Sequence, residues 1–158
     1  MSNADSGILD DVRIGVRLKI AALWMAMLFL FAYGDIFGFF NTGRIEEVIA
    51  GEVSGMKITQ AFLFGASVYI AIASVMIFLT LVLTPKVSRW TNIVLPVLYI
   101  ATIVASVIGE TWAYFYFLSI VEGALLLLII RYAWTWPRHV HEGQVSGGQV
   151  SQGEVGAT

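Results

Sequence analysis

The chain has 158 residues, of which 58% are hydrophobic and only 13% are charged. A soluble domain carries about 25% charged residues, so a fold this apolar would have too little polar surface for water, and we expect a bilayer as its solvent. The absence of cysteine excludes disulfides, thiolate metal sites and a cysteine nucleophile, and the formal net charge of −2 argues against a nucleic-acid partner.

The first segment, residues 1–19, is predicted to be cytoplasmic and to contain a short interfacial helix. Its apolar residues recur at helical spacing. Asp10 and Asp11 precede the basic residues, which is the order that the helix dipole favours. The apolar residues of this pattern are Ile8, Leu9, Val12, Val16 and Ile20.

The next segment, residues 20–137, contains four apolar stretches that are each long enough to cross about 30 Å of hydrocarbon, which needs ~20 residues. Backbone polar groups in hydrocarbon must be satisfied internally, so these stretches should be helices. Short connections predict that the second, third and fourth are consecutive neighbours. We therefore expect an all-α fold, a four-transmembrane-helix antiparallel bundle. The predicted spans are residues 20–40, 58–83, 90–109 and 112–136.

Basic residues gather on one side of these spans. Seven of the nine Lys and Arg residues flank that side, and Arg44 and Lys57 flank the other. The positive-inside rule therefore places both termini in the cytoplasm, for a multi-pass protein of the cell (inner) membrane. The opposite side receives four acidic residues. These are Glu46, Glu47, Glu52 and Glu110.

Two further segments are expected to lie outside the hydrocarbon. Residues 41–57 have Ile45, Val48 and Ile49 on one side and predict a helix of one or two turns on the outer surface. Residues 138–158 repeat the sequence GQVS and are rich in Gly, Ser and Gln, which predicts a disordered cytoplasmic tail.

One carboxylate lies in the middle of the last apolar stretch. Glu122 falls about nine residues into the span, or ~14 Å, which is close to the membrane midplane. An ionisable residue there costs ~2.5–3.5 kcal/mol on insertion and usually faces an interior or a wet cavity. Arg131 points to the opposite face of the helix and cannot pair with it. We predict that Glu122 binds a proton or a ligand; the alternative is a structural hydrogen bond.

Four other polar residues are candidates for the same ligand- or proton-binding site. Ser119 shares the helix face of Glu122, and Tyr99 lies on a stripe of the third span. Gln60 begins the second span, where it could instead satisfy terminal amides. Asp35 lies ~8 Å below the outer end of the first span, where it could instead reach outer water.

Small and polar residues also form stripes at alternating steps of four and three. Such stripes are typical packing seams between membrane helices, and their presence on several helices predicts a homo-oligomer. In the first span the small residues are the pair Gly34 and Gly38. The other two stripes are Gln60, Phe64, Ser67, Ala71, Ser74 and Phe78, and Asn92, Pro96, Tyr99, Ile103, Ser106 and Glu110.

Four sequence motifs resemble an uncharacterised family of prokaryotic four-helix membrane proteins (domain of unknown function 6326). They are LW…YGDIFGFF, KITQAFLFGA, RWTNI and W-x-Y-F-Y-F…VE…RYAWTWP, and the resemblance covers residues 16–137. It implies no activity. A weaker, architectural likeness is to DoxX-like four-helix proteins. The resemblance places Asp35, Gln60, Arg89, Asn92 and Glu122 at the polar positions of the family pattern.

The leading functional hypothesis is a small oligomeric transporter, channel or ligand-binding protein with a carboxylate-lined cavity. Its ligand would be a proton, a cation or a small amphiphile. One alternative is an accessory or scaffold protein that binds partner helices, and a weaker one is a quinone-linked redox subunit. The predicted spans contain no histidine and no nucleophile constellation, so we expect no enzymatic activity, no cofactor and no metal site. The expected partners are membrane lipids and further copies of the chain.

Overall fold

The computed structural model describes residues 14–136. The predicted tail lies outside these residues, and so does most of the predicted interfacial helix. Val16 and Ile20, which belong to the apolar pattern of that predicted helix, lie in the first long helix of the structure.

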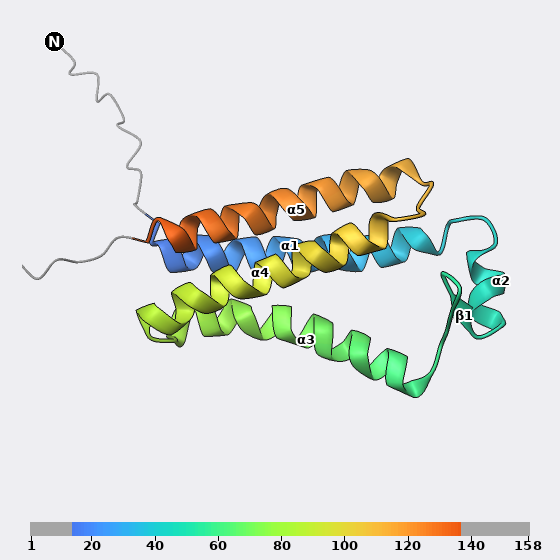
Figure 1. Ribbon diagram of the computed structural model, residues 1–158, viewed down its shortest axis with the longest axis horizontal. Helices are drawn as coiled ribbons and strands as arrows, with labels where there is room; N and C mark the ends of the chain where they lie inside the picture. The colour runs from blue at the N-terminus through green and yellow to red at the C-terminus, as the bar shows by residue number, and fades with distance from the viewer. Residues whose placement is uncertain (1–13, 137–158) are drawn as a thin grey trace, which may run out of the picture.

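Four long helices make up most of the described chain and form an antiparallel bundle (Figure 1). Each is long and apolar enough to cross a membrane. The predicted four-span fold is therefore confirmed, and the protein is an integral, multi-pass membrane protein. The helices are α1 (Val16–Gly38), α3 (Gln60–Val82), α4 (Pro85–Val107) and α5 (Ala113–Trp134).

Local chemistry accounts for where two of these helices begin. At α3, the Thr59 side chain accepts a hydrogen bond from the Phe62 amide (3.1 Å) and so caps the first turn. Helix α4 begins at Pro85, five residues before the predicted start at residue 90. Proline is well suited to the first position of a helix, because its fixed φ matches the helix and its missing N–H has no partner there anyway.

The helices do not pack in the simple order of the sequence. Helix α1 packs against both α3 and α5, and α5 packs against α4. Helices α3 and α4 meet near their short connection and separate toward their other ends (Figure 1). The prediction of consecutive neighbours therefore holds for α4 and α5, whereas α3 packs mainly on α1.

The segment between α1 and α3 folds into a small cap at one end of the bundle (Figure 1). It contains the predicted short helix and, in addition, a two-stranded antiparallel hairpin. Ser54 and Gly55 both have positive φ, as the tight turn of such a hairpin requires. The Arg44 guanidinium donates to Ser54 Oγ (2.8 Å) and ties the helix to this turn. The elements are α2 (Arg44–Ile49), β1 (Glu52–Val53) and β2 (Met56–Lys57).

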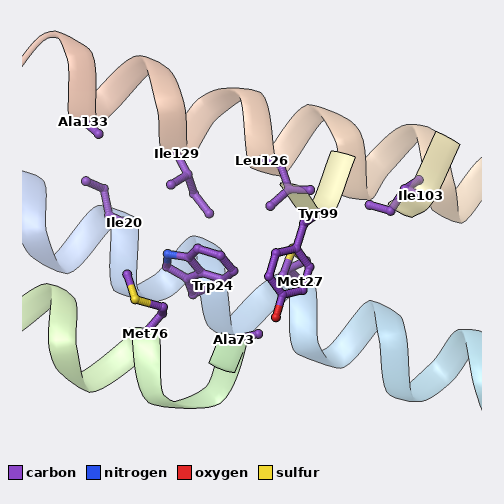
Figure 2. Packing of buried hydrophobic residues seen from close by; sticks show 10 residues of the cluster. All are labelled: Ile20, Trp24, Met27, Ala73, Met76, Tyr99, Ile103, Leu126, Ile129 and Ala133. Atoms are coloured by element: carbon purple, nitrogen blue, oxygen red, sulfur yellow. The ribbon is translucent and has the colours of Figure 1, made fainter. Parts of the chain in front are cut away.

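The buried hydrophobic core lies toward the end of the bundle that holds the α3–α4 connection (Figure 2). We call this end, with residues 16–27, 73–82, 85–96 and 124–134, the closed half. We call residues 28–38, 60–72, 97–107 and 113–123, next to the cap, the open half. The core residues are Ile20, Trp24, Met27, Ala73, Met76, Tyr99, Ile103, Leu126, Ile129 and Ala133.

Candidate functional site

A hydrogen-bonded cluster around Asn92 joins three helices in the closed half. Trp24 Nε1 of α1 donates to Asn92 Oδ1 (2.7 Å), and Thr80 Oγ1 of α3 donates to the same oxygen (3.2 Å). Asn92 Nδ2 donates to the Ser88 carbonyl (2.8 Å). All four residues are fully buried. Every polar atom of the Asn92 amide therefore has a partner, and the cluster holds the closed half together.

Glu122 is also buried, but its carboxylate has no such partners. The side chain is 7% exposed and lies on the same face of α5 as the buried Ser119 and Leu126. Within residues 14–136, no hydrogen bond or ion pair reaches the carboxylate, and no buried polar side-chain atom is both unpaired and fully occluded. The carboxylate oxygens of Glu122 therefore keep a narrow contact with open space.

Two groups from other helices lie within electrostatic range of Glu122. The Asp35 carboxylate of α1 acts on Glu122, and the Glu122 carboxylate acts on the Tyr69 hydroxyl of α3. Asp35 is exposed. Its neighbour Gly34 packs against α5, where a Cβ on this glycine would lie 3.6 Å from Leu118 Cδ1. This is an ordinary contact distance, so the packing of α1 on α5 at this point does not require a glycine. The packing places two carboxylates in one region of the open half.

Three aromatic rings lie at the boundary between the two halves, each on a different helix. The Tyr69 ring centroid lies 4.4 Å from that of Tyr99 and 5.9 Å from that of Phe31, and the Phe31–Tyr99 separation is 6.2 Å. The Tyr99 hydroxyl donates to the Tyr69 carbonyl. The Glu122 carboxylate of α5 acts electrostatically on Tyr69, so side chains of all four helices meet near this level of the bundle.

Helix α3 is packed unevenly along its length. Its buried residues are Ala73, Met76 and Thr80, all in the closed half. Gly65 and Ala66 lie about one turn beyond Tyr69 on the same side of α3, and both are exposed. A Cβ added at Gly65 would meet nothing within 4 Å. In the open half α3 therefore diverges from the other helices beyond Tyr69, whereas Ser119 and Glu122 on the interior side of α5 stay buried.

The predicted stripe on α3 does not face the bundle. All six of its residues, from Gln60 to Phe78, are exposed. Ser67 and Ser74 donate instead to the carbonyls of Leu63 (2.8 Å) and Ile70 (3.0 Å) in their own helix. Their hydroxyl groups need no partner from another helix. The stripe is therefore not a seam between helices of one chain, and a seam between two copies stays a prediction.

The stripe on α4 does face the bundle over most of its length. Asn92, Pro96, Tyr99 and Ile103 are all buried. Ser106, the next member of the stripe, is exposed. The stripe leaves the interior where α3 separates from α4, which agrees with an opening in this half.

The structure brings together some of the predicted site residues and separates others. Glu122 and Ser119 share a buried face, and Asp35 lies close enough to act on Glu122. The Tyr99 hydroxyl donates its hydrogen to the Tyr69 carbonyl of α3. Gln60 is exposed at the first turn of α3 and forms no side-chain hydrogen bond within the described chain.

Two residues of the site, Phe31 and Tyr69, were missed by the sequence analysis. Both lie in stretches so rich in apolar and aromatic residues that one ring does not stand out. Tyr69 carried one signal, because it is the only tyrosine of its span, and a tyrosine hydroxyl in hydrocarbon needs a partner. The structure supplies Thr102 Oγ1 at 2.7 Å.

Two observations limit what else the described residues can bind. No group of three or more His, Cys, Asp and Glu residues in the described chain is placed to hold a metal ion. A shallow hollow of about 440 Å³ lies along the closed half of α4, away from Glu122. Its lining residues are Lys86, Val87, Trp90, Thr91 and Val94.

The comparison with protein families identifies the chain. Residues 14–142 match the model of a family of unknown function (DUF6326). This match covers most of the chain, so the protein belongs to that family, and the predicted resemblance is confirmed. No curated protein and no solved structure matches the chain significantly, so the likeness to DoxX-like proteins stays a prediction.

Proposed function

We propose that the protein binds a proton or another cation at Glu122, inside the membrane. The observation that carries this proposal is that Glu122 is buried, yet no hydrogen bond or ion pair from residues 14–136 satisfies it. An unpaired charge in hydrocarbon is costly, so ionisable residues in spans are usually functional. The exposed Asp35 nearby adds a second negative charge and attracts cations to the site.

The balance of charges around Glu122 favours a cation over an anion. The titratable groups near it from other helices are Asp35 of α1 and Tyr69 of α3, with Tyr99 of α4 in contact with Tyr69. None of these groups carries a positive charge. A proton and a positively charged ligand would therefore compete for the same carboxylate, which is the basis of exchange by a carrier.

The charges at the two ends of the bundle support an opening toward the outside. The described part of the closed end carries five basic residues and no acidic residue, and the cap carries three glutamates. Under the positive-inside rule the closed half then lies toward the cytoplasm. The basic residues are Arg17, Lys19, Lys86, Arg89 and Arg131, and the glutamates are Glu46, Glu47 and Glu52.

Reporter fusions test this orientation. A fusion after Phe40 should report the exterior, and a fusion after Pro137 should report the cytoplasm. Identical signals from both fusions would contradict the four-span topology, and exchanged signals would turn the site toward the cytoplasm.

Infrared difference spectroscopy tests the binding of a proton. In the wild-type protein we expect a protonated carboxyl band that disappears as the pH rises between about 4 and 9. The band should be absent in Glu122→Gln and unchanged in Glu46→Gln, which alters an exposed glutamate of the cap. A wild-type spectrum that contains no carboxyl band lost in Glu122→Gln over this range would contradict the proposal.

A second candidate function, binding to a partner helix, is favoured by the exposed stripe on α3. This side carries Ser67, Ala71 and Ser74, small residues that allow another helix to approach closely. The chain has no cysteine, so single cysteines can be introduced for crosslinking. If two copies meet at the stripe, Ser74→Cys should crosslink in membranes, whereas Ala73→Cys, which is buried against α1, should not.

A further inference from the structure

We infer that the closed half holds one anionic phospholipid on the outward side of α4, with the lipid phosphate at Lys86 and an acyl chain in the hollow beside it. This inference is independent of Glu122 and of the proposed function. It depends on three features of α4: the lining of the hollow, the basic groups at its end, and the depth of both in the bilayer.

The lining of the hollow is polar at one end and apolar at the other. The hollow has a volume of about 440 Å³ and is lined by Lys86, Val87, Trp90, Thr91 and Val94. The side chains of Val87, Trp90 and Val94 are more than half exposed. The Thr91 hydroxyl donates to the Val87 carbonyl of its own helix. The side-chain groups left to bond a ligand are therefore the Lys86 ammonium and the Trp90 indole N–H, both near the start of α4.

The charge of Lys86 favours an anionic ligand. The charged groups of Arg17, Lys19 and Arg89 each lie 5.6–5.8 Å from the centroid of an aromatic ring. Lys86 is exposed, and within residues 14–136 no hydrogen bond, ion pair or aromatic ring engages its ammonium group. The described part of the closed half contains no acidic residue. A negatively charged lipid headgroup is the counter-charge that a membrane supplies at such a place.

Arg89 can add a second positive charge to the same phosphate. It lies three residues after Lys86, and side chains at this spacing are neighbours on the surface of a helix. Its guanidinium donates to the Trp134 carbonyl of α5 (3.3 Å). That bond uses one of the five N–H groups of an arginine, and the others remain able to bond a phosphate, which suits the planar guanidinium.

The depth of these groups matches the length of a phospholipid. Only Leu83 and Thr84 connect α3 to α4, so α4 begins at the membrane surface (Figure 1). Lys86 in the first turn lies at the level of the headgroups, and Trp90 follows one turn deeper, as is typical of tryptophan at an interface. Val94 lies ~12 Å further along the helix than Lys86, within the hydrocarbon. A ligand that fills the hollow must be charged at one end and apolar at the other.

Native mass spectrometry of the full chain in mild detergent, titrated with lipid, tests the inference. The first phosphatidylglycerol should bind ~5- to 30-fold more tightly than phosphatidylcholine with the same chains. Lys86→Gln should weaken phosphatidylglycerol binding ~3- to 10-fold, and Lys57→Gln, at an exposed lysine of the cap, should leave it unchanged. Val94→Trp, which fills the hollow, should weaken it roughly 2- to 5-fold. Val104→Trp, at an exposed valine of the open half, should leave it unchanged.

Quenching of Trp90 in vesicles gives a second measurement. The difference in fluorescence between wild type and Trp90→Phe should be quenched more by brominated phosphatidylglycerol than by brominated phosphatidylcholine, because the anionic lipid lies against this ring.

Four outcomes would overturn the inference. The first is equal affinity for the two lipids, which would show boundary lipid only. The second is an equal effect of Lys86→Gln and Lys57→Gln, which would follow net charge and not position. The third is an equal effect of Val94→Trp and Val104→Trp, which would place the lipid outside the hollow. The fourth is a dimer of the wild-type chain that Val94→Trp dissociates and phosphatidylglycerol does not, which would show that a second copy covers the hollow.

Discussion

The two halves of the bundle differ in whether a buried polar side chain has hydrogen-bond partners. In the closed half, Asn92 has hydrogen-bond partners from α1, α3 and its own helix. In the open half, Glu122 is almost as deeply buried and has no partner in the described chain. A buried amide with every bond satisfied stabilises a membrane fold, whereas a buried unpaired acid destabilises it. Burial alone therefore does not identify a functional residue; the state of its partners does.

The path of α3 explains this difference. In the closed half, α3 lies against α1 and supplies Thr80 to the Asn92 cluster. In the open half it has no buried residue, and no side chain of α3 donates a hydrogen bond to Glu122 as Thr80 does to Asn92. The same helix is thus buried in one half and exposed in the other, and the change occurs at Tyr69, which is its last aromatic contact with α1 and α4.

The largest effect is expected from Asn92→Ala. This change removes the acceptor of the Trp24 indole and leaves a buried N–H without a partner, so the free energy of unfolding should fall by about 2–4 kcal/mol. Reversible unfolding in mixed micelles measures it. Thr91→Ala is the control, because its hydroxyl bonds only within α4, and its effect should stay below ~0.5 kcal/mol. Equal losses in both variants would contradict the role of the cluster.

Glu122→Leu should change the free energy of unfolding in the opposite direction to Asn92→Ala. It removes an unpaired acid from hydrocarbon, so the free energy of unfolding should rise by about 1–3 kcal/mol, while cation binding disappears. The same unfolding assay, with Glu122→Gln for comparison, measures it. A loss of stability in both variants would show that Glu122 is a structural hydrogen-bonding group, and the difference between the halves would then disappear.

A smaller effect is expected from Tyr99→Phe, at the boundary between the halves. The change removes the hydrogen bond from α4 to the Tyr69 carbonyl of α3 but keeps the ring. The free energy of unfolding should fall by about 0.5–1.5 kcal/mol. Tyr33→Phe, at an exposed ring of α1, is the matched control. If the two variants unfold alike, the Tyr99 hydroxyl does not hold α3 at this boundary.

Hydropathy and residue spacing predicted the four spans, the stripe of α4 and the face of α5 that carries Glu122. They failed on α3, because the hydroxyls of Ser67 and Ser74 bond to carbonyls of their own helix and can therefore face lipid, and because in lipid an apolar residue is equally favourable inside and outside the bundle. Only the contacts of Ala73, Met76 and Thr80 decide which side is buried.

The partners of the polar groups were also beyond sequence reasoning. Asn92 and Trp24 are 68 residues apart in the chain, and no local pattern pairs them. The hairpin of the cap was missed for a different reason, since strands of two residues carry no periodic signal. The depth of Glu122 was predictable from its position in the helix, but the absence of a partner was visible only in the structure.

Cysteine labelling compares the two halves most directly. Ser119 lies one turn from Glu122 on the same face of α5, and Ser88 belongs to the Asn92 cluster; both serines are buried. A thiol reacts as the thiolate, which forms where water reaches it. With a small water-soluble thiol reagent in native membranes, Ser119→Cys should be labelled and Ser88→Cys should not. Equal labelling of the two variants, or no labelling of Ser119→Cys, would contradict an open site at Glu122.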